Sequence, residues 1–370
     1  MIYLDNSATT HKKPLSTHIA MLKAMTFYCA NPSRSSHNLS IRTGQKIEMC
    51  RQHIKQFVEA KDDSYVVYTY NCTEAINYAL QGTLKPNDHV VISTFEHNAV
   101  VRTLGNMGIE YSVAKPSGNV ITLNDVVKHI RKNTKMVVIN QTSNVTGDTT
   151  PLTEIGKYCK QNNIIFLVDG AQSAGHVKIN MKRDNINMLA LAGHKGLYGI
   201  QGIGALVLSD VYPTPLKYGG SGTESEKITM PDYYPDRLEA GTINTVGILA
   251  LDGGISYVEK HLDKINTKTS KLTIMLLNYL KKNPNYIVYS NTPSSGVVSF
   301  NIKDMDNSDV VNYLNEKNIC VRGGLHCAPL VHIYLGTIKT GTIRVSISHY
   351  NTSHDIKTLI KTLEKLVKKR

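Results

Sequence analysis

Short apolar runs alternate with longer amphipathic segments along most of this chain, and the alternation restricts the folds open to it. Apolar runs rich in Val and Ile occur at residues 65–69, 89–93, 136–140 and 164–168. Such runs are typical of buried strands, and segments such as residues 154–161 have the pattern of helices between them. The repetition of strand and helix predicts an α/β fold, in which helices cover both faces of a mostly parallel sheet.

The pattern changes in the last third of the chain. Two long helical stretches, at residues 245–261 and 266–282, precede the pair Asn283-Pro284, which favours a helix stop. Strands near residues 297–302 and 342–348 then alternate with helices. This part of the sequence predicts a smaller α+β unit.

The length of the chain also favours two unequal domains. At 370 residues it exceeds the size at which one hydrophobic core usually stops growing. We therefore expect a large domain at residues 14–250 and a small C-terminal domain at residues 251–370. The N-terminal segment, residues 1–13, is expected to join the small domain.

Charge and cysteine content narrow the possible functions. The formal net charge is +13, but the lysines are spread along apparent helices without the interleaved aromatics of a single-strand platform, so nucleic-acid binding is not expected. The six cysteines never form a Cys-x-x-Cys pair, so neither disulfides nor a metal site is expected. No apolar run reaches the roughly 18 residues of a membrane span, and no secretory signal is visible. We expect a cytoplasmic protein.

A carboxylate and a lysine at strand ends give the first chemical signal. Asp169 follows the run at residues 164–168, and Lys195 lies in the turn Gly193-His194-Lys195-Gly196. Ligands of parallel sheets bind beyond the carboxyl ends of the strands. Pyridoxal phosphate chemistry needs this pair, because a lysine holds the aldehyde as a Schiff base and a carboxylate keeps the pyridine nitrogen protonated. The pair makes the chain a candidate enzyme.

Polar residues follow three other predicted strands, and those after the first two have two interpretations each. Cys72 and Thr73 open a helix, where free N–H groups and the Thr73 hydroxyl could hold a phosphate; a polar helix cap without a ligand is the alternative. His97 could take part in chemistry at the same sheet edge, although a lone histidine is more often a structural hydrogen-bonding residue. Asn144 lies among ordinary turn residues.

A series of motifs in one order carries a family resemblance. The motifs are Tyr3-Leu4-Asp5-Asn6-Ser7-Ala8-Thr9-Thr10, Cys72-Thr73-Glu74-Ala75-Ile76-Asn77, Glu96-His97-Asn98-Ala99, Asn144-Val145-Thr146-Gly147, Asp169-Gly170-Ala171-Gln172, Gly193-His194-Lys195, Glu239-Ala240-Gly241-Thr242 and Arg322-Gly323-Gly324-Leu325-His326-Cys327-Ala328. Together they resemble the class V aminotransferases, which have the fold of type I pyridoxal phosphate-dependent transferases. Within that group the chain is similar to cysteine desulfurases with a short catalytic cysteine loop.

The resemblance implies a set of contacts to pyridoxal 5'-phosphate. Lys195 would form the Schiff base, Asp169 would pair with the pyridine nitrogen, and His97 would lie over the ring, where it could also shuttle protons. The remaining implied contacts are Gln172 and Asn144 at the phenolate oxygen and the substrate side of the ring, and Thr73, the Cys72 backbone and His194 at the phosphate. Thr242 would reach the phosphate of the neighbouring subunit, which implies a homodimer.

The resemblance also implies a substrate and a product. Arg344, with Arg322 nearby, would bind the carboxylate of L-cysteine through its bidentate fork, the alternative being a surface ion pair. Cys327 would attack the sulfur as a thiolate, leaving L-alanine and a persulfide on Cys327. A small sulfur-acceptor protein would dock over residues 323–329.

Other functions remain open on the sequence. The same scaffold supports selenocysteine lyases and other class V aminotransferases, and the basic surface would also suit an RNA-binding protein on an idle scaffold. The pathway served, whether iron–sulfur cluster assembly or RNA thiolation, is not specified. The chain departs from the family pattern at Ala192, where a serine often binds the phosphate, and at Cys72, where glycine, serine or threonine is more common.

Overall fold

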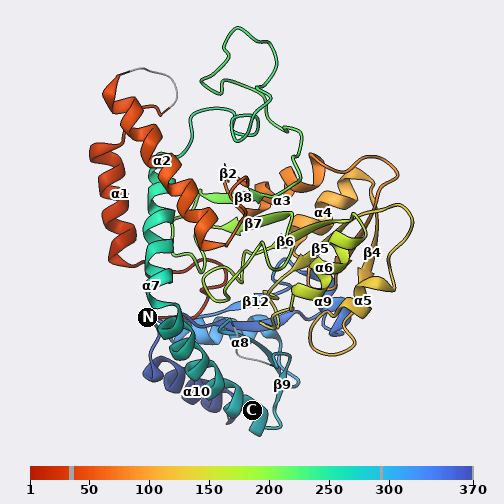
Figure 1. Ribbon diagram of the computed structural model, residues 1–370. Coiled ribbons are helices and arrows are strands. Elements are labelled where there is room, and N and C mark those ends of the chain that lie inside the picture. Colours follow the sequence, from red (N-terminus) through yellow and green to blue (C-terminus); the bar gives the residue numbers. More distant parts are fainter. Residues whose placement is uncertain (33–36, 292–294, 369–370) are drawn as a thin grey trace.

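The computed structural model describes residues 1–32, 37–291 and 295–368, and a seven-stranded sheet forms its centre (Figure 1). In spatial order its strands are β2 (Tyr65–Thr69), β8 (Gly204–Leu208), β7 (Met188–Ala192), β6 (Ile165–Asp169), β5 (Thr134–Asn140), β3 (His89–Ser93) and β4 (Glu110–Ala114). The five strands from β7 to β4 are parallel, and β8 runs antiparallel to both of its neighbours. The predicted mostly parallel α/β sheet is confirmed.

Side chains of the central strands alternate between two hydrophobic cores, because successive residues of a strand point to opposite faces. Val66 and Val137 pack in the first core, whereas Val67 and Val138 pack in the second. Both faces are covered, which is why the strands are continuous apolar runs in the sequence. The helices over the first face are α1 (Leu15–Phe27), α2 (Asn38–Phe57), α5 (Leu123–Val127), α6 (Thr153–Gln161) and part of α7 (Thr245–Lys282), and those over the second are α3 (Cys72–Gln81) and α4 (Asn98–Met107).

A smaller α+β unit lies below the large sheet in Figure 1 and contains both chain ends. Its four-stranded antiparallel sheet has the order β12 (Arg322–Gly324), β13 (Thr342–Ser346), β10 (Val297–Ile302) and β9 (Tyr286–Val288). Helices α8 (Asn307–Glu316) and α10 (Ser353–Lys368) pack in its core, whereas the short helix α9 (Pro329–Tyr334), which follows β12, packs against the large sheet through Val331. The N-terminal strand β1 (Ile2–Tyr3) pairs with β11 (Ile319–Cys320), and Leu4 is buried in this unit's core.

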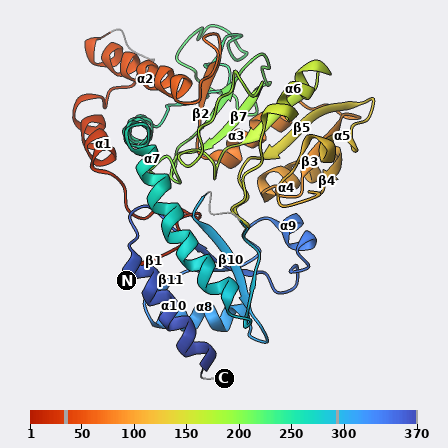
Figure 2. The same ribbon diagram turned by 60° about the horizontal axis from the view of Figure 1, so that its bottom comes forward.

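The two long helices expected at residues 245–261 and 266–282 are one continuous helix, α7, so that prediction was wrong. The connecting residues 262–265 contain no glycine or proline, and Ile265 is buried, so nothing interrupts the helix. The first part of α7 packs against the large sheet and the last part against the small unit, as Figure 2 shows. The division between residues 14–250 and 251–370 therefore falls inside a helix, and we keep it as a proposal.

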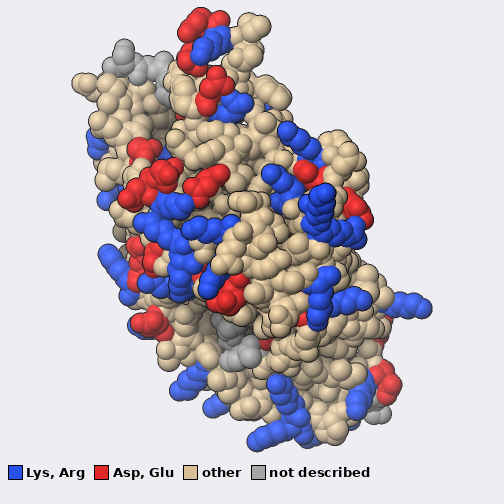
Figure 3. Space-filling view, turned by 45° about the vertical axis from the view of Figure 1, so that its right-hand side comes forward, with Lys and Arg blue, Asp and Glu red and all other residues tan. Residues whose placement is uncertain are grey.

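The distribution of surface charge and the apolar character of the helices bear on binding to nucleic acids and to membranes. On the face drawn in Figure 3, lysines and arginines stand in several separate groups, and acidic side chains lie among many of them. They do not form one continuous basic band on that face. Within the described ranges, no helix combines the length and apolar character that crossing a membrane requires.

Candidate active site

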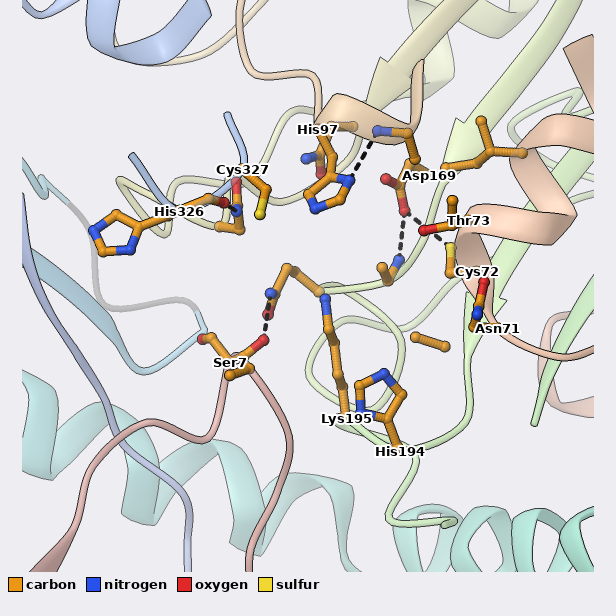
Figure 4. Close-up of a pocket in the computed structure, with 18 of the residues that line it drawn as sticks. Ser7, Asn71, Cys72, Thr73, His97, Asp169, His194, Lys195, His326 and Cys327 are labelled. Atoms are coloured by element: carbon orange, nitrogen blue, oxygen red, sulfur yellow. Dashed lines mark hydrogen bonds between the residues drawn. The ribbon is translucent and has the colours of Figure 1, made fainter. Parts of the chain in front are cut away.

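A cavity of about 300 Å³ lies at the carboxyl ends of the parallel strands, between the large sheet and the small unit. The large sheet contributes residues that follow β2, β3, β5, β6 and β7, and the small unit contributes residues on and after β12 and on β13. Figure 4 shows the labelled side chains around this space. Of the residues given roles from the sequence, all line the cavity except Thr242, which lies outside the cavity and is exposed to solvent.

The N-terminus of α3 points at the cavity with unused backbone donors. Asn71 caps the helix by accepting a hydrogen bond from the Glu74 N–H at 2.9 Å. In the part of the chain that the structure describes, the N–H groups of Cys72 and Thr73 have no acceptor. Free N–H groups at a helix start attract anions, so this end of the cavity suits a phosphate.

His97 caps α4 and also lines the cavity, so both interpretations of this residue apply. Its Nδ1 accepts a hydrogen bond from the Ala99 N–H at 3.0 Å. Burial, the largest influence, lowers the pKa of His97 to about 4, so the ring is neutral at pH 7. A neutral imidazole whose Nδ1 accepts must carry its proton on Nε2. His97 is therefore a hydrogen-bond donor at Nε2.

Asp169 and Lys195 lie on opposite sides of the cavity (Figure 4). Asp169 Oδ1 accepts a hydrogen bond from the Ala171 N–H at 2.9 Å. Lys195 follows β7 on a turn in which its carbonyl accepts from Tyr198 N–H, and among the described residues its amine forms no ion pair within 4.0 Å. Burial lowers the pKa of Lys195, and the nearby Asp169 opposes that shift. The amine is thereby more easily neutral and nucleophilic.

Two side-chain amides, those of Asn144 and Gln172, also line the cavity. The Asn144 side-chain N–H donates to the His326 carbonyl at 2.6 Å, and the Gln172 side-chain N–H donates to the Ser7 carbonyl at 3.0 Å. Asn144 Oδ1 and His194 Nδ1 are buried without a hydrogen-bond partner in the described parts of the chain. Buried polar atoms normally have partners, so these two atoms indicate that a polar ligand belongs here.

Two arginines stand side by side on adjacent strands of the small sheet. Arg322 on β12 is paired in register with Arg344 on β13. Arg344 is buried, contrary to the surface alternative, and it donates to Asp5 Oδ1 at 2.9 Å and to the Asn144 carbonyl at 3.1 Å. Its Nε has no partner within the described residues. Burial, together with Arg322, lowers the pKa of Arg344, which favours binding of an additional anion.

Cys327 follows β12 in a turn of two consecutive left-handed residues, with φ of 49° at His326 and 58° at Cys327. Its carbonyl accepts from the Asn98 N–H at 2.7 Å, which fixes the turn against α4. Arg322 Nη2 lies 3.8 Å from Cys327 Sγ. This arginine, rather than His326, supplies the neighbouring cation.

His326 has a structural role in this turn. Its Nε2 contacts the Thr342 carbonyl at 3.0 Å, and its ring extends away from Cys327 in Figure 4. Burial lowers the pKa of His326 to about 2, so the ring is uncharged.

Comparison with known proteins places these residues in a family. The model for the class V aminotransferases matches residues 2–359. A probable cysteine desulfurase of Pyrococcus abyssi is 35% identical, with 100% of this chain and 94% of the relative covered. The apo structure of a cysteine desulfurase from Thermococcus onnurineus has a TM-score of 0.88 at 32% identity, covering 100% and 95%. The chain belongs to the class V aminotransferases, among the cysteine desulfurases.

A second solved structure extends the family comparison. The cysteine desulfurase CsdA of Escherichia coli, in an S-sulfonic acid form, has a TM-score of 0.86 at 26% identity, with 99% of this chain and 94% of that chain covered. The predicted family and the type I fold are thus confirmed.

Pyridoxal phosphate is the cofactor of class V aminotransferases in general, and the cavity fits it. The space of about 300 Å³ suits a substituted pyridine ring. The free N–H groups at the start of α3 suit its phosphate, and the unpartnered Asn144 Oδ1 and His194 Nδ1 suit its polar substituents. Ala192 also lines the cavity and presents a methyl group to it.

Several residues that contribute to the cavity received no role from the sequence. Asn140 ends β5 and lines the cavity, and Ser7 reaches it from the N-terminal segment. Asp5 pairs with Arg344 although 339 positions separate them. Asn140 could have been suspected because it ends a predicted strand, whereas the contact between Asp5 and Arg344 has no local signal.

Proposed function

We propose that this class V aminotransferase is a pyridoxal phosphate-dependent cysteine desulfurase, which converts L-cysteine to L-alanine and takes up the sulfur on Cys327. The position of Cys327 carries the proposal. Its thiol lines the same cavity as Lys195 and Asp169, and Arg322 lies 3.8 Å from it. Transamination needs the lysine and the acid, but it has no use for a thiol at this place.

The lining residues would hold the cofactor in defined roles. Lys195 would bind its aldehyde, Asp169 its ring nitrogen, and His97 would lie against the ring. The start of α3, with Cys72 N–H and the Thr73 hydroxyl, and His194 would hold the phosphate, and Asn144 and Gln172 the phenolate side. When bound, pyridoxal phosphate supplies a sink for the electrons that develop at the substrate α-carbon.

Substrate binding and proton transfer would fall to Arg344 and Lys195. Arg344 is fixed by Asp5 and keeps its Nε unpartnered in the described chain, so it can bind the carboxylate of L-cysteine, with Arg322 beside it. The Lys195 amine, whose pKa burial lowers, would remove the α-proton at Nζ and return it.

Cys327 would then accept the sulfur. Its thiolate attacks the sulfur of the bound cysteine, forming an S–S bond while the substrate C–S bond breaks. The electron pair of that bond stays with the carbon fragment, which takes up a proton and leaves as L-alanine. Arg322 Nη2 lies 3.8 Å from the attacking sulfur and places a positive charge beside it. The product on the protein is a Cys327 persulfide.

A persulfide at this position needs an acceptor, and we propose a small sulfur-carrier protein that docks over residues 323–329. Apolar side chains beside the loop are available to such a partner, since Leu325 is 37% and Ile333 60% exposed. A thiol of the carrier would attack the outer sulfur and regenerate the Cys327 thiolate.

We also propose a homodimer in which Thr242 completes the neighbouring site. Thr242 is exposed and lies outside its own subunit's cavity. Three positions before it, Glu239 is fixed by a bidentate ion pair to Arg51 with distances of 2.8 and 2.6 Å. The exposed threonine is therefore presented from an anchored segment.

Product analysis with a Cys327→Ala variant tests the proposed function. The parent protein, loaded with pyridoxal phosphate and given L-cysteine and a reductant, should release equal amounts of alanine and sulfide. Cys327→Ala should bind the cofactor normally but lose at least about 100-fold in alanine release, because no nucleophile takes the sulfur. Cys29→Ala, at an exposed cysteine that does not line the cavity, is the matched control. Unchanged turnover in Cys327→Ala would favour a selenocysteine lyase or another aminotransferase.

A further inference from the structure

A second thiol lines the active-site cavity, and the proposed reaction does not use it. Cys72 is the first residue of α3 and is buried in the wall beside Asp169. Its Sγ lies 3.5 Å from Asp169 Oδ1, in hydrogen-bonding geometry, and Figure 4 marks this contact. The thiol is the donor, since a carboxylate can only accept.

This contact fixes the orientation of the Asp169 carboxylate. Oδ1 accepts two hydrogen bonds, one from the Ala171 N–H at 2.9 Å and one from the Cys72 thiol. Within the described chain, Oδ2 accepts none. Two donors on one oxygen leave the other as the only oxygen of the carboxylate available to a ligand in the cavity.

The Cys72 thiol keeps its proton in this environment. Burial, followed by the charge of Asp169, raises the pKa of Cys72 well above its ordinary value, and Lys195 opposes the shift. A protonated thiol is a donor and not a nucleophile. The two thiols of the cavity differ in their surroundings. Cys327 lies beside the cation of Arg322, whereas Cys72 lies beside the carboxylate of Asp169.

We propose that Cys72 is a positioning residue, whose S–H group turns the Asp169 carboxylate so that Oδ2 faces the pyridine nitrogen of the cofactor. The inference rests on the proposed function for the identity of that ligand. It assigns to the Cys72 side chain a role separate from the phosphate contact of its backbone N–H.

The S–H stretching vibration tests the hydrogen bond without any cofactor. Infrared difference spectra of the cofactor-free protein, parent minus Cys72→Ala, isolate the Cys72 band. We expect this band at lower frequency than the band of Cys159, a buried cysteine for which no thiol hydrogen bond is found among the described residues. Asp169→Asn should move the Cys72 band toward higher frequency, because a neutral amide is a weaker acceptor. A Cys72 band at the Cys159 position would overturn the proposal.

Cofactor affinity tests the positioning role. We expect the dissociation constant for pyridoxal phosphate, measured by equilibrium dialysis, to rise about threefold to tenfold in Cys72→Ala, the effect of one hydrogen bond. Cys72→Ser should recover most of the loss because its hydroxyl can donate, and Cys159→Ala should bind like the parent.

The visible absorption of the bound cofactor provides a second readout of the same role. Its pH titration midpoint should shift in Cys72→Ala and return toward the parent value in Cys72→Ser. Equal affinity and an equal midpoint in parent and Cys72→Ala would overturn the inference while leaving the proposed function intact. A parent protein that binds no pyridoxal phosphate would overturn both.

Discussion

The buried ion pair between Arg51 and Glu239 makes the Glu239→Gln variant the sharpest test of the fold around the site. Arg51 on α2 donates to both carboxylate oxygens, at 2.8 and 2.6 Å, and the Tyr68 N–H donates to the same group at 2.6 Å. The side chains of Arg51 and Glu239 are only 9% and 6% exposed. Glutamine keeps the size of the side chain but removes the charge, so the buried Arg51 is left with the more distant and exposed carboxylate of Glu48, 3.7 Å from its Nε.

The expected loss of stability is large for a change that conserves shape. Removing one partner of a buried pair typically destabilises a protein by about 3 to 5 kcal/mol. For Glu239→Gln we expect a loss of about 3 kcal/mol in the free energy of unfolding, because the amide oxygen still accepts one of the hydrogen bonds. Urea unfolding of the cofactor-free protein, followed by the fluorescence of its 20 tyrosines, measures the difference.

An exposed ion pair in the same part of the protein provides the control. Lys61 and Asp210 form a pair whose side chains are 44% and 51% exposed. Asp210→Asn should change the free energy of unfolding by no more than about 0.5 kcal/mol, because solvent screens such pairs. If Glu239→Gln loses less than about 1 kcal/mol, or no more than Asp210→Asn, the reasoning about the buried pair is refuted.

Three further predictions concern pH, substrate binding and subunit sharing. His53 contacts Asp252 and Glu259, which raise the pKa of His53 from 6.5 to about 9. Protonated His53 therefore stabilises the folded state by about 2 kcal/mol, after allowing for solvent exposure of these side chains. This contribution to the free energy of unfolding is complete below pH 6.5 and is lost as the pH rises through 9. His53→Gln should abolish that pH dependence in urea titrations, and an unchanged dependence would contradict the assignment. Arg344→Gln should raise KM for L-cysteine at least about 30-fold through loss of a charged contact, with a smaller effect on kcat; an unaltered KM would exclude carboxylate binding by this residue. At pyridoxal phosphate concentrations that do not saturate Thr242→Ala, mixed dimers of Lys195→Ala and Thr242→Ala subunits should be more active than either homodimer, because one site per mixed dimer is intact. Mixed dimers no more active than the homodimers would place Thr242 outside the neighbouring site.

The sequence predicted four of the seven strands of the large sheet, at residues 65–69, 89–93, 136–140 and 164–168, because these strands are largely buried and their apolar runs are uninterrupted. The edge strand β4 is only partly buried and has no such run. The residues that follow those strands, such as Asp169 and Lys195, could be placed at one edge from the sheet topology alone. The continuity of α7 was missed, since the packing of residues 262–265, which include the buried Ile265, depends on partners that the sequence does not reveal. The contact between Asp5 and Arg344 depends on how the chain returns on itself, and no local pattern reports it.

The hydrogen bonds of the cavity were also beyond local reasoning. The sequence identified Cys72 as unusual, but its thiol contact with Asp169 depends on the relative positions of two strands that are not neighbours in the sheet. Likewise, the sequence placed His326 beside Cys327 without revealing that its ring is directed toward Thr342.

The 38-residue helix α7 has a consequence for how this enzyme can move and be divided. Because one continuous helix packs both in the first core of the large sheet and in the core of the small unit, the small unit cannot rotate about a loose connection at that point without bending this helix. Changes of shape during turnover should therefore arise in the segments around the cavity rather than by wholesale opening. For the same reason, neither half is expected to survive expression on its own, since a cut near residue 250 would leave apolar turns of this helix without their partners.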